Sequence, residues 1–147
     1  KVYKALGGIK MSEKIVVVGS GGWGTAVAIL LAKKGYDVYL PQDESGLSYE
    51  MMNENNKLEI NKKIFEGDVE CIKNSDVLIF DLNGRVPDEG GCVELGMAYA
   101  WGIKSIGFKT DTRALDYTGD DNLMIEGCMD FKIARSLEEL EKMLKEI

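Results

Sequence analysis

The 147-residue sequence contains no histidine, and this absence removes several kinds of catalytic site. Without an imidazole there is no Ser-His-Asp or Cys-His triad, no HExxH metal site and no histidine general base. Acid–base work must then fall to carboxylates, lysine, tyrosine or cysteine. Because 25 side chains are Asp or Glu, carboxylate chemistry is the natural expectation.

Cysteine is scarce as well, with Cys71, Cys92 and Cys128 far apart in the chain and no C-x-x-C pair. This pattern argues against a zinc site and predicts a reducing cytoplasm. No run of 18 apolar residues predicts a membrane span, and no signal peptide is evident. The net charge of −7 argues against nucleic acid as the main partner, because phosphate binding needs a basic face.

The length is sufficient for one domain with a core of its own and too short for two. Met11 opens a segment, MSEKIVVVG, that reads like a native start. We therefore expect a single α/β domain over residues 11–147, with residues 1–10 as an extension or a cloning scar.

Short β-branched or apolar runs alternate with segments of helical spacing along the chain. Strands are expected at 14–18, 36–40, 77–80, 104–108 and 131–134. Helices are expected at 23–34, 57–74, 92–100, from residue 122 and at 137–147. In the helix over 57–74, the apolar face is expected to consist of Leu58, Ile64, Phe65, Val69 and Ile72. This order predicts a three-layer, doubly wound parallel sheet of five strands, flavodoxin-like or Rossmann-like, in the order 2-1-3-4-5.

In such a sheet, ligands bind at the carboxyl ends of the strands, here over strands 1 and 3. This topology groups the glycine-rich turn over residues 19–24 with Asp81, Asp88 and Glu94. Glu94 is flanked by apolar residues, where an ionised carboxylate is costly unless it is paired or used in chemistry. The competing interpretation is a glutamate near a helix start, favoured there by the helix dipole.

The turn itself reads G-S-G-G-W-G and includes Gly19, Ser20, Gly21 and Trp23 at a strand–helix junction. Its glycines can let backbone amides cradle a phosphate, or can simply allow a tight turn for packing. Residues 11–40 resemble the first βαβ unit of NAD-dependent glycerol-3-phosphate dehydrogenases. A dinucleotide site needs an acidic residue at the end of the second strand. Pro41 and Gln42 stand there instead, with Asp43 two positions late. A smaller phosphate or the sugar end of a nucleoside is the alternative ligand.

From about residue 36 onward the chain resembles the nucleoside 2-deoxyribosyltransferase family. The pattern that carries the resemblance is D-x-x-x-x-x-E-L-G-x-A-x-A-x-G from Asp88, followed by T-D-x-R and N-L-M. The resemblance implies that Glu94 is the nucleophile and Asp88 an active-site carboxylate. It also implies that Asp68 contacts the nucleobase, whereas composition alone suggests a solvated acid. Asn122 would reach a neighbouring subunit's site, although by itself it reads as a helix N-cap. Asp111 and Arg113 can pair as a loop clamp.

The function implied by the resemblance is cleavage of the N-glycosidic bond of a 2′-deoxynucleoside through a deoxyribosyl ester on Glu94. Asp88 or Asp68 would assist the leaving base. It implies no metal or redox cofactor, and a homo-oligomer. One alternative is hydrolysis of a 2′-deoxynucleoside 5′-monophosphate, since Gly19 and Ser20 resemble the phosphate loop of the related N-hydrolases. Another is a hybrid chain, natural or engineered, that folds and binds a nucleotide without catalysis.

Overall fold

The structure is a computed structural model and describes residues 13–19, 22–41, 47, 49–113 and 120–147. Ser20 and Gly21, two of the residues expected to bind substrate, lie outside the described residues. The expected extension over residues 1–10 lies outside them too.

Five parallel strands form one sheet in the order β2-β1-β3-β4-β5. They are β1 (Lys14–Val18), β2 (Asp37–Tyr39), β3 (Val77–Asp81), β4 (Lys104–Phe108) and β5 (Ile133–Ala134). The fold class and the strand order predicted from the sequence are confirmed. β2 and β5 are shorter than expected, as edge strands often are.

The described helices are α1 (Gly22–Lys33), η1 (Tyr49–Met51), α3 (Lys57–Lys73), α4 (Glu89–Ala100), α5 (Leu123–Cys128) and α6 (Leu137–Lys145). α4 begins at Glu89, three residues before the predicted start. The reason is a side-chain cap, because the Asp88 carboxylate accepts a hydrogen bond of 2.7 Å from the Gly91 amide. α6 ends at Lys145, two residues early.

The core has two parts, one on each face of the sheet. Alternate residues of β1 point to opposite faces, so Val17 contributes to one part and Val16 to the other. The first part is closed by α1 and α6, through residues such as Leu31 and Leu140. The second lies under α3, α4 and α5 and contains Phe80 and Leu95.

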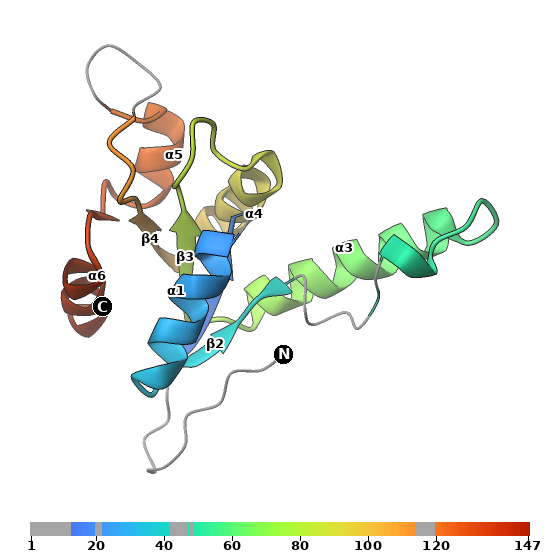
Figure 1. Ribbon diagram of the computed structural model, residues 1–147, viewed down its shortest axis with the longest axis horizontal. Coiled ribbons are helices and arrows are strands. Elements are labelled where there is room, and N and C mark those ends of the chain that lie inside the picture. Colours follow the sequence, from blue (N-terminus) through green and yellow to red (C-terminus); the bar gives the residue numbers. More distant parts are fainter. Residues whose placement is uncertain (1–12, 20–21, 42–46, 48, 114–119) are drawn as a thin grey trace.

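α3 departs from the expectation, because much of its apolar face is not buried. Figure 1 shows this long helix extending away from the sheet. Its buried residues are Ile60 and Ile72, whereas Leu58 is 69% and Phe65 58% exposed. Helical spacing identified the apolar stripe of α3 but could not show whether the core of the same chain covers it. None of the described helices has the length and hydrophobicity needed to cross a membrane.

Candidate active site

The turn after β1 packs directly against the end of β3, at the carboxyl edge of the sheet. Gly19 has φ +109°, and a Cβ there would lie 2.8 Å from the Asp81 carbonyl oxygen. A Cβ on Gly24 would lie 3.0 Å from the Gly19 carbonyl oxygen. Gly19 therefore requires glycine, and a side chain at Gly24 needs a small shift of the Gly19 backbone. The packing interpretation of the glycine pattern has direct support in these contacts.

Asp81 is the last residue of β3 and is only 3% exposed. Its Oδ1 accepts hydrogen bonds from the Asn83 backbone amide at 3.1 Å and from Asn83 Nδ2 at 2.7 Å. Its Oδ2 is buried and accepts no hydrogen bond from the described residues. Burial raises the pKa of this carboxyl, while the two bonds from Asn83 oppose that shift.

Trp23 lies in the first turn of α1 and is 60% exposed. An indole this exposed contributes little to the core beneath α1. It is placed after the Gly19 turn, on the same side of the sheet edge, where it stays a predicted contact for a ligand.

Asp68, Asp88 and Glu94 are brought together by two helices. Asp68 comes from α3, Asp88 is the N-cap of α4, and Glu94 lies in the second turn of α4. The N-terminus of α4 lies against the end of β3, because a Cβ on Gly91 would be 2.5 Å from the ring of Phe80. This close approach places Asp88, the N-cap of α4, near the carboxyl edge of the sheet, and the charges of both Asp68 and Asp88 act on Glu94.

Glu94 has the most perturbed carboxyl of the three. Burial, and then the negative charges of Asp68 and Asp88, raise its pKa from 4.5 to about 7. Burial also raises the pKa of Asp68, whose Oδ1 is buried without a hydrogen-bond partner among the described residues. A glutamate that titrates near neutral pH can serve as a nucleophile in one step and accept or release a proton in another.

Asn122 is the N-cap of α5, since its side chain accepts a hydrogen bond of 2.9 Å from the Met124 amide. The capping interpretation is therefore confirmed. Asn122 is exposed, and its role at a neighbouring subunit's site stays a prediction.

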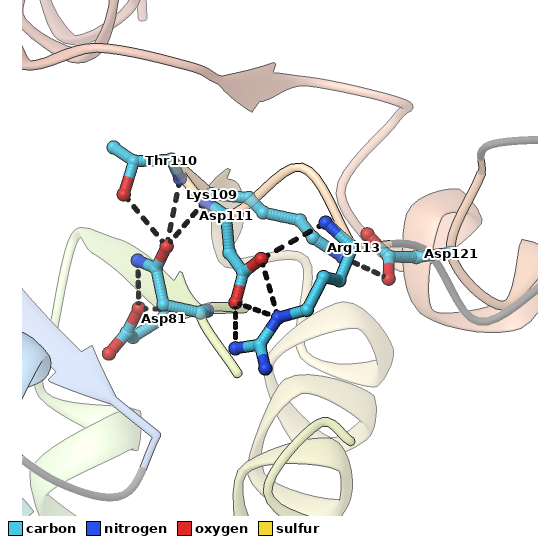
Figure 2. A network of polar contacts seen from close by, with 7 residues as sticks. Asp81, Lys109, Thr110, Asp111, Arg113 and Asp121 are labelled. Atoms are coloured by element: carbon cyan, nitrogen blue, oxygen red, sulfur yellow. Dashed lines mark hydrogen bonds and ion pairs between the residues drawn. The ribbon is translucent and has the colours of Figure 1, made fainter. Parts of the chain in front are cut away.

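A polar network joins the loops that follow β3 and β4, and sequence reasoning found only part of it (Figure 2). The expected clamp is present, because Arg113 Nε donates to both carboxylate oxygens of Asp111 at 2.9 Å. Lys109 and Asp121 form an ion pair of 2.6 Å with both side chains almost fully buried. Asn83 was missed as well. Lys109 directly follows β4, Asn83 stands two residues after β3 and Asp121 two residues before α5, and these positions next to element ends are the signal that could have identified them.

No group of three or more Cys, Asp or Glu side chains in the described part of the chain is arranged to hold a metal ion. The thiols of Cys71, Cys92 and Cys128 are half-buried, and no disulfide forms among the described residues.

Comparison with solved structures shows the same fold in other proteins. A conserved protein from Enterococcus faecalis superposes with a TM-score of 0.71 at 23% identity, over 92% of this chain and 98% of the other. A 2-desoxiribosyltransferase from Leishmania mexicana gives a TM-score of 0.64 at 22% identity, over 91% and 97%. At these identities the likeness shows the fold alone.

A different relative matches a short segment. The glycerol-3-phosphate dehydrogenase of Citrifermentans bemidjiense is 56% identical over 41 residues, which are 28% of this chain. The chain spans only 12% of that enzyme's length. The resemblance of the first βαβ unit to these dehydrogenases is thus confirmed.

The remaining comparison covers most of the chain. The family model for nucleoside 2-deoxyribosyltransferase matches residues 21–129, a range that includes Asp68, Asp88, Glu94 and Asn122. This chain belongs to the nucleoside 2-deoxyribosyltransferase family.

Proposed function

We propose that this protein cleaves the N-glycosidic bond of a 2′-deoxynucleoside, with Glu94 as the nucleophile. The observation that carries the proposal is the position of Glu94, half-buried on α4 and under the negative charge of Asp68 and Asp88. The negative charges of two neighbouring carboxylates raise the free energy of an ionised Glu94. The positive charge that develops on the sugar carbon in the transition state offsets this repulsion.

In the first step, a Glu94 carboxylate oxygen bonds to the anomeric carbon as the bond from that carbon to the base nitrogen breaks. The bonding electrons leave with the base, which takes a proton from a neighbouring carboxyl. We assign this proton to Asp68, because it is a partly buried carboxyl close enough to act electrostatically on Glu94. The product is a deoxyribosyl ester of Glu94. An acceptor base or water then attacks the same carbon, the bond to Glu94 breaks and releases its carboxylate, and the proton of the attacking group returns to Asp68. The Asp88 carboxylate accepts a hydrogen bond from the Gly91 amide, and in this fixed position it orients Glu94.

The charge of the site favours a neutral nucleoside over a nucleotide. None of the three carboxylates forms an ion pair with a described lysine or arginine. A phosphate dianion near them would meet repulsion without compensation. Hydrolysis of a 5′-monophosphate remains the second candidate, because a glycine-rich turn at the start of α1 is a favourable place for an anion.

The test is incubation with 2′-deoxyadenosine, 2′-deoxyinosine, thymidine and their 5′-monophosphates, with and without a free acceptor base, followed by chromatography. We expect a new nucleoside when the acceptor is present. Free base from the monophosphates alone would move the assignment to the hydrolase. A folded protein that yields no product would overturn both and support a hybrid chain without catalysis.

We also propose that the protein is a homo-oligomer that uses α3 as a contact surface. Leu58, Phe65 and Val69 lie along one stripe of the helix at spacings of seven and four residues, and the first two are well exposed. A helix stripe of this kind is usually covered by other apolar groups.

The charges of α3 favour a second copy of the same helix as the cover. Its first half carries Lys57, Lys62 and Lys63 against one acid, whereas its second half carries Glu66, Asp68 and Glu70 against one lysine. Phe65 is the middle residue of the 17-residue helix. Antiparallel pairing about a two-fold axis at Phe65 would set each basic half against an acidic half.

Phe65→Glu is therefore expected to lower the mass found by sedimentation velocity to that of a single chain, because it puts a charge at the axis. Phe131→Glu makes the same change at another exposed phenylalanine and is expected to keep the wild-type mass. A wild-type protein that sediments as a monomer would contradict the proposed contact.

We further propose a cytoplasmic location and a structural, packing role for the glycine-rich turn. The three cysteines, far apart in the chain and without a C-x-x-C pair, suit a reducing compartment. The close contacts of Gly19 and Gly24 support the packing role of the turn. The dehydrogenase-like segment would then supply a strand, a turn and a helix to the sheet, with the carboxylates supplied by the remainder of the chain.

A further inference from the structure

The side chain of Asn83 is hydrogen-bonded at both ends, between two loops at the carboxyl edge of the sheet. Its Nδ2 donates to Asp81 Oδ1 at 2.7 Å. Its Oδ1 accepts from the Thr110 amide and the Thr110 hydroxyl, each at 2.9 Å, and from the Asp111 amide at 3.0 Å. Figure 2 shows Asp81, Thr110 and Asp111 around this network. One amide group thus connects the end of β3 to the chain that follows β4.

The connection is reciprocal. Asn83 reaches from the first loop to the backbone of the second, and Asp111 reaches back from the second to the first. The Asp111 carboxylate is held by Arg113 and by the backbone of Gly84, and both interactions keep its pKa well below the usual range. Two independent sets of bonds therefore fix the loops to each other.

Each of the two loops leads to a residue of the proposed site. Asn83 stands five residues before Asp88, which caps α4 and so sets the position of Glu94. On the side of the second loop, Lys109 directly precedes Thr110 and forms the buried ion pair with Asp121, and Asn122 is the next residue. A displacement of Asn83 would be transmitted along both paths.

We propose that Asn83 is a positioning residue of the active site, which couples the loop leading to Asp88 and helix α4 to the segment after β4 that is paired with Asp121, beside Asn122, and which orients the buried Asp81. The proposal rests on the proposed function for its effect on turnover. The coupling of the two loops is a property of the unliganded protein and can be measured without turnover.

The amide is chemically required at this position. Towards Thr110 and Asp111 the side chain must accept hydrogen bonds, and towards the Asp81 carboxylate it must donate one. Asparagine carries both functions on one short side chain. An ionised aspartate has two acceptors and would place a negative charge about 2.7 Å from Asp81 Oδ1. A protonated aspartic acid can both donate and accept, so it reproduces the native bonds.

The first experiment compares wild type with Asn83→Asp and Asn83→Ala in the nucleoside cleavage assay at about pH 5 and about pH 8. The charged groups in contact with this network are Asp81 on β3, and Asp111 with its partner Arg113 after β4. Two adjacent carboxyls share a proton at mildly acidic pH and lose it at higher pH. We expect Asn83→Asp to lie within a few-fold of wild-type kcat at the lower pH. At the higher pH we expect a loss of roughly 100-fold, the effect of a small misplacement of catalytic groups.

Asn83→Ala is expected to lose a similar factor in kcat at both pH values, with a smaller change in KM. Asn55→Asp makes the same chemical change at an exposed turn and is expected to behave as wild type. If Asn83 had a structural role only, both variants would lower the folded fraction of the protein. The kcat of Asn83→Asp would then not recover at the lower pH while that of Asn83→Ala stayed low. Equal loss in Asn83→Asp at the two pH values, or no loss in either variant, would overturn the proposal.

The second experiment is hydrogen exchange of the unliganded protein. The Thr110 and Asp111 amides are expected to exchange at least about 10-fold faster in Asn83→Ala, while Ile79 in the centre of β3 stays protected. Unchanged exchange at both amides would overturn the coupling. If the wild type cleaves no nucleoside, the proposed function fails. Hydrogen exchange still shows in that case whether Asn83 couples the two loops. If Asn83→Ala does not fold, Asn83→Asp across the same pH range supplies both readouts.

Discussion

Replacement of Glu94 by glutamine is expected to lower the turnover of a 2′-deoxynucleoside by on the order of 10⁴-fold or more. The amide cannot form the sugar ester, so the two-step path is lost while the shape of the side chain is kept. Turnover is measured by chromatography of the released base, and folding by circular dichroism.

Glu89→Gln is the matched control, because Glu89 is exposed in the first turn of the same helix. It removes one negative charge near the helix N-terminus and is expected to change kcat by no more than a few-fold. Turnover that survives in Glu94→Gln, or an equal loss in both variants, would show that another residue is the nucleophile.

The same Glu94→Gln variant is expected to be more stable than wild type above pH 7. A pKa raised from 4.5 to about 7 means that the folded state holds a proton that the unfolded state has released. Wild-type stability therefore falls, relative to the variant, as pH rises from 4.5 to about 7, and the difference is constant above that. We expect a plateau of about 2 kcal/mol, because partial solvent contact reduces the full value. Urea denaturation at several pH values measures the difference, and a pH-independent difference would contradict the raised pKa.

Gly91→Ala is expected to destabilise the protein by about 2–3 kcal/mol and to lower Tm by roughly 5–10 °C. Its Cβ would lie 2.5 Å from the ring of Phe80, which is fully buried in β3. Neither the strand nor the ring can give way cheaply, so the N-terminus of α4 must move. Because Asp88 caps that helix through the Gly91 amide, the carboxylates are expected to move with it and reduce turnover. Thermal unfolding and the nucleoside assay measure the two effects.

Gly96→Ala, in the same helix, is expected to stabilise the protein instead. A Cβ on Gly96 meets nothing within 4 Å, so the substitution adds helix propensity without a clash. We expect a gain of about 0.5–1 kcal/mol in stability. If both substitutions shifted Tm in the same direction and by the same amount, helix propensity alone would explain them. The contact between Gly91 and Phe80 would then not control the position of α4.

Several features of this protein could be predicted from local sequence pattern, because the physics behind them is local. Strand runs such as residues 77–80 are continuous and apolar since parallel strands are covered on both faces. The strand order followed from alternating strands and helices and from the handedness of crossovers. The E-L-G pattern around Glu94 and the cap at Asn122 were readable because each needs only a few consecutive residues.

The sequence by itself thus determined the α/β architecture and the strand order, and it predicted the edge of the sheet for the site and the carboxylates that form it. Only the tertiary structure decided how those carboxylates act on one another. Asp68 perturbs Glu94 because α3 packs beside α4, a contact between residues 26 positions apart. The exposure of Phe65 and the bonds of Asn83 to Thr110 and Asp111 depend in the same way on which surfaces meet. Periodicity and spacing describe one segment at a time, whereas burial, charge coupling and hydrogen-bond partners arise between segments.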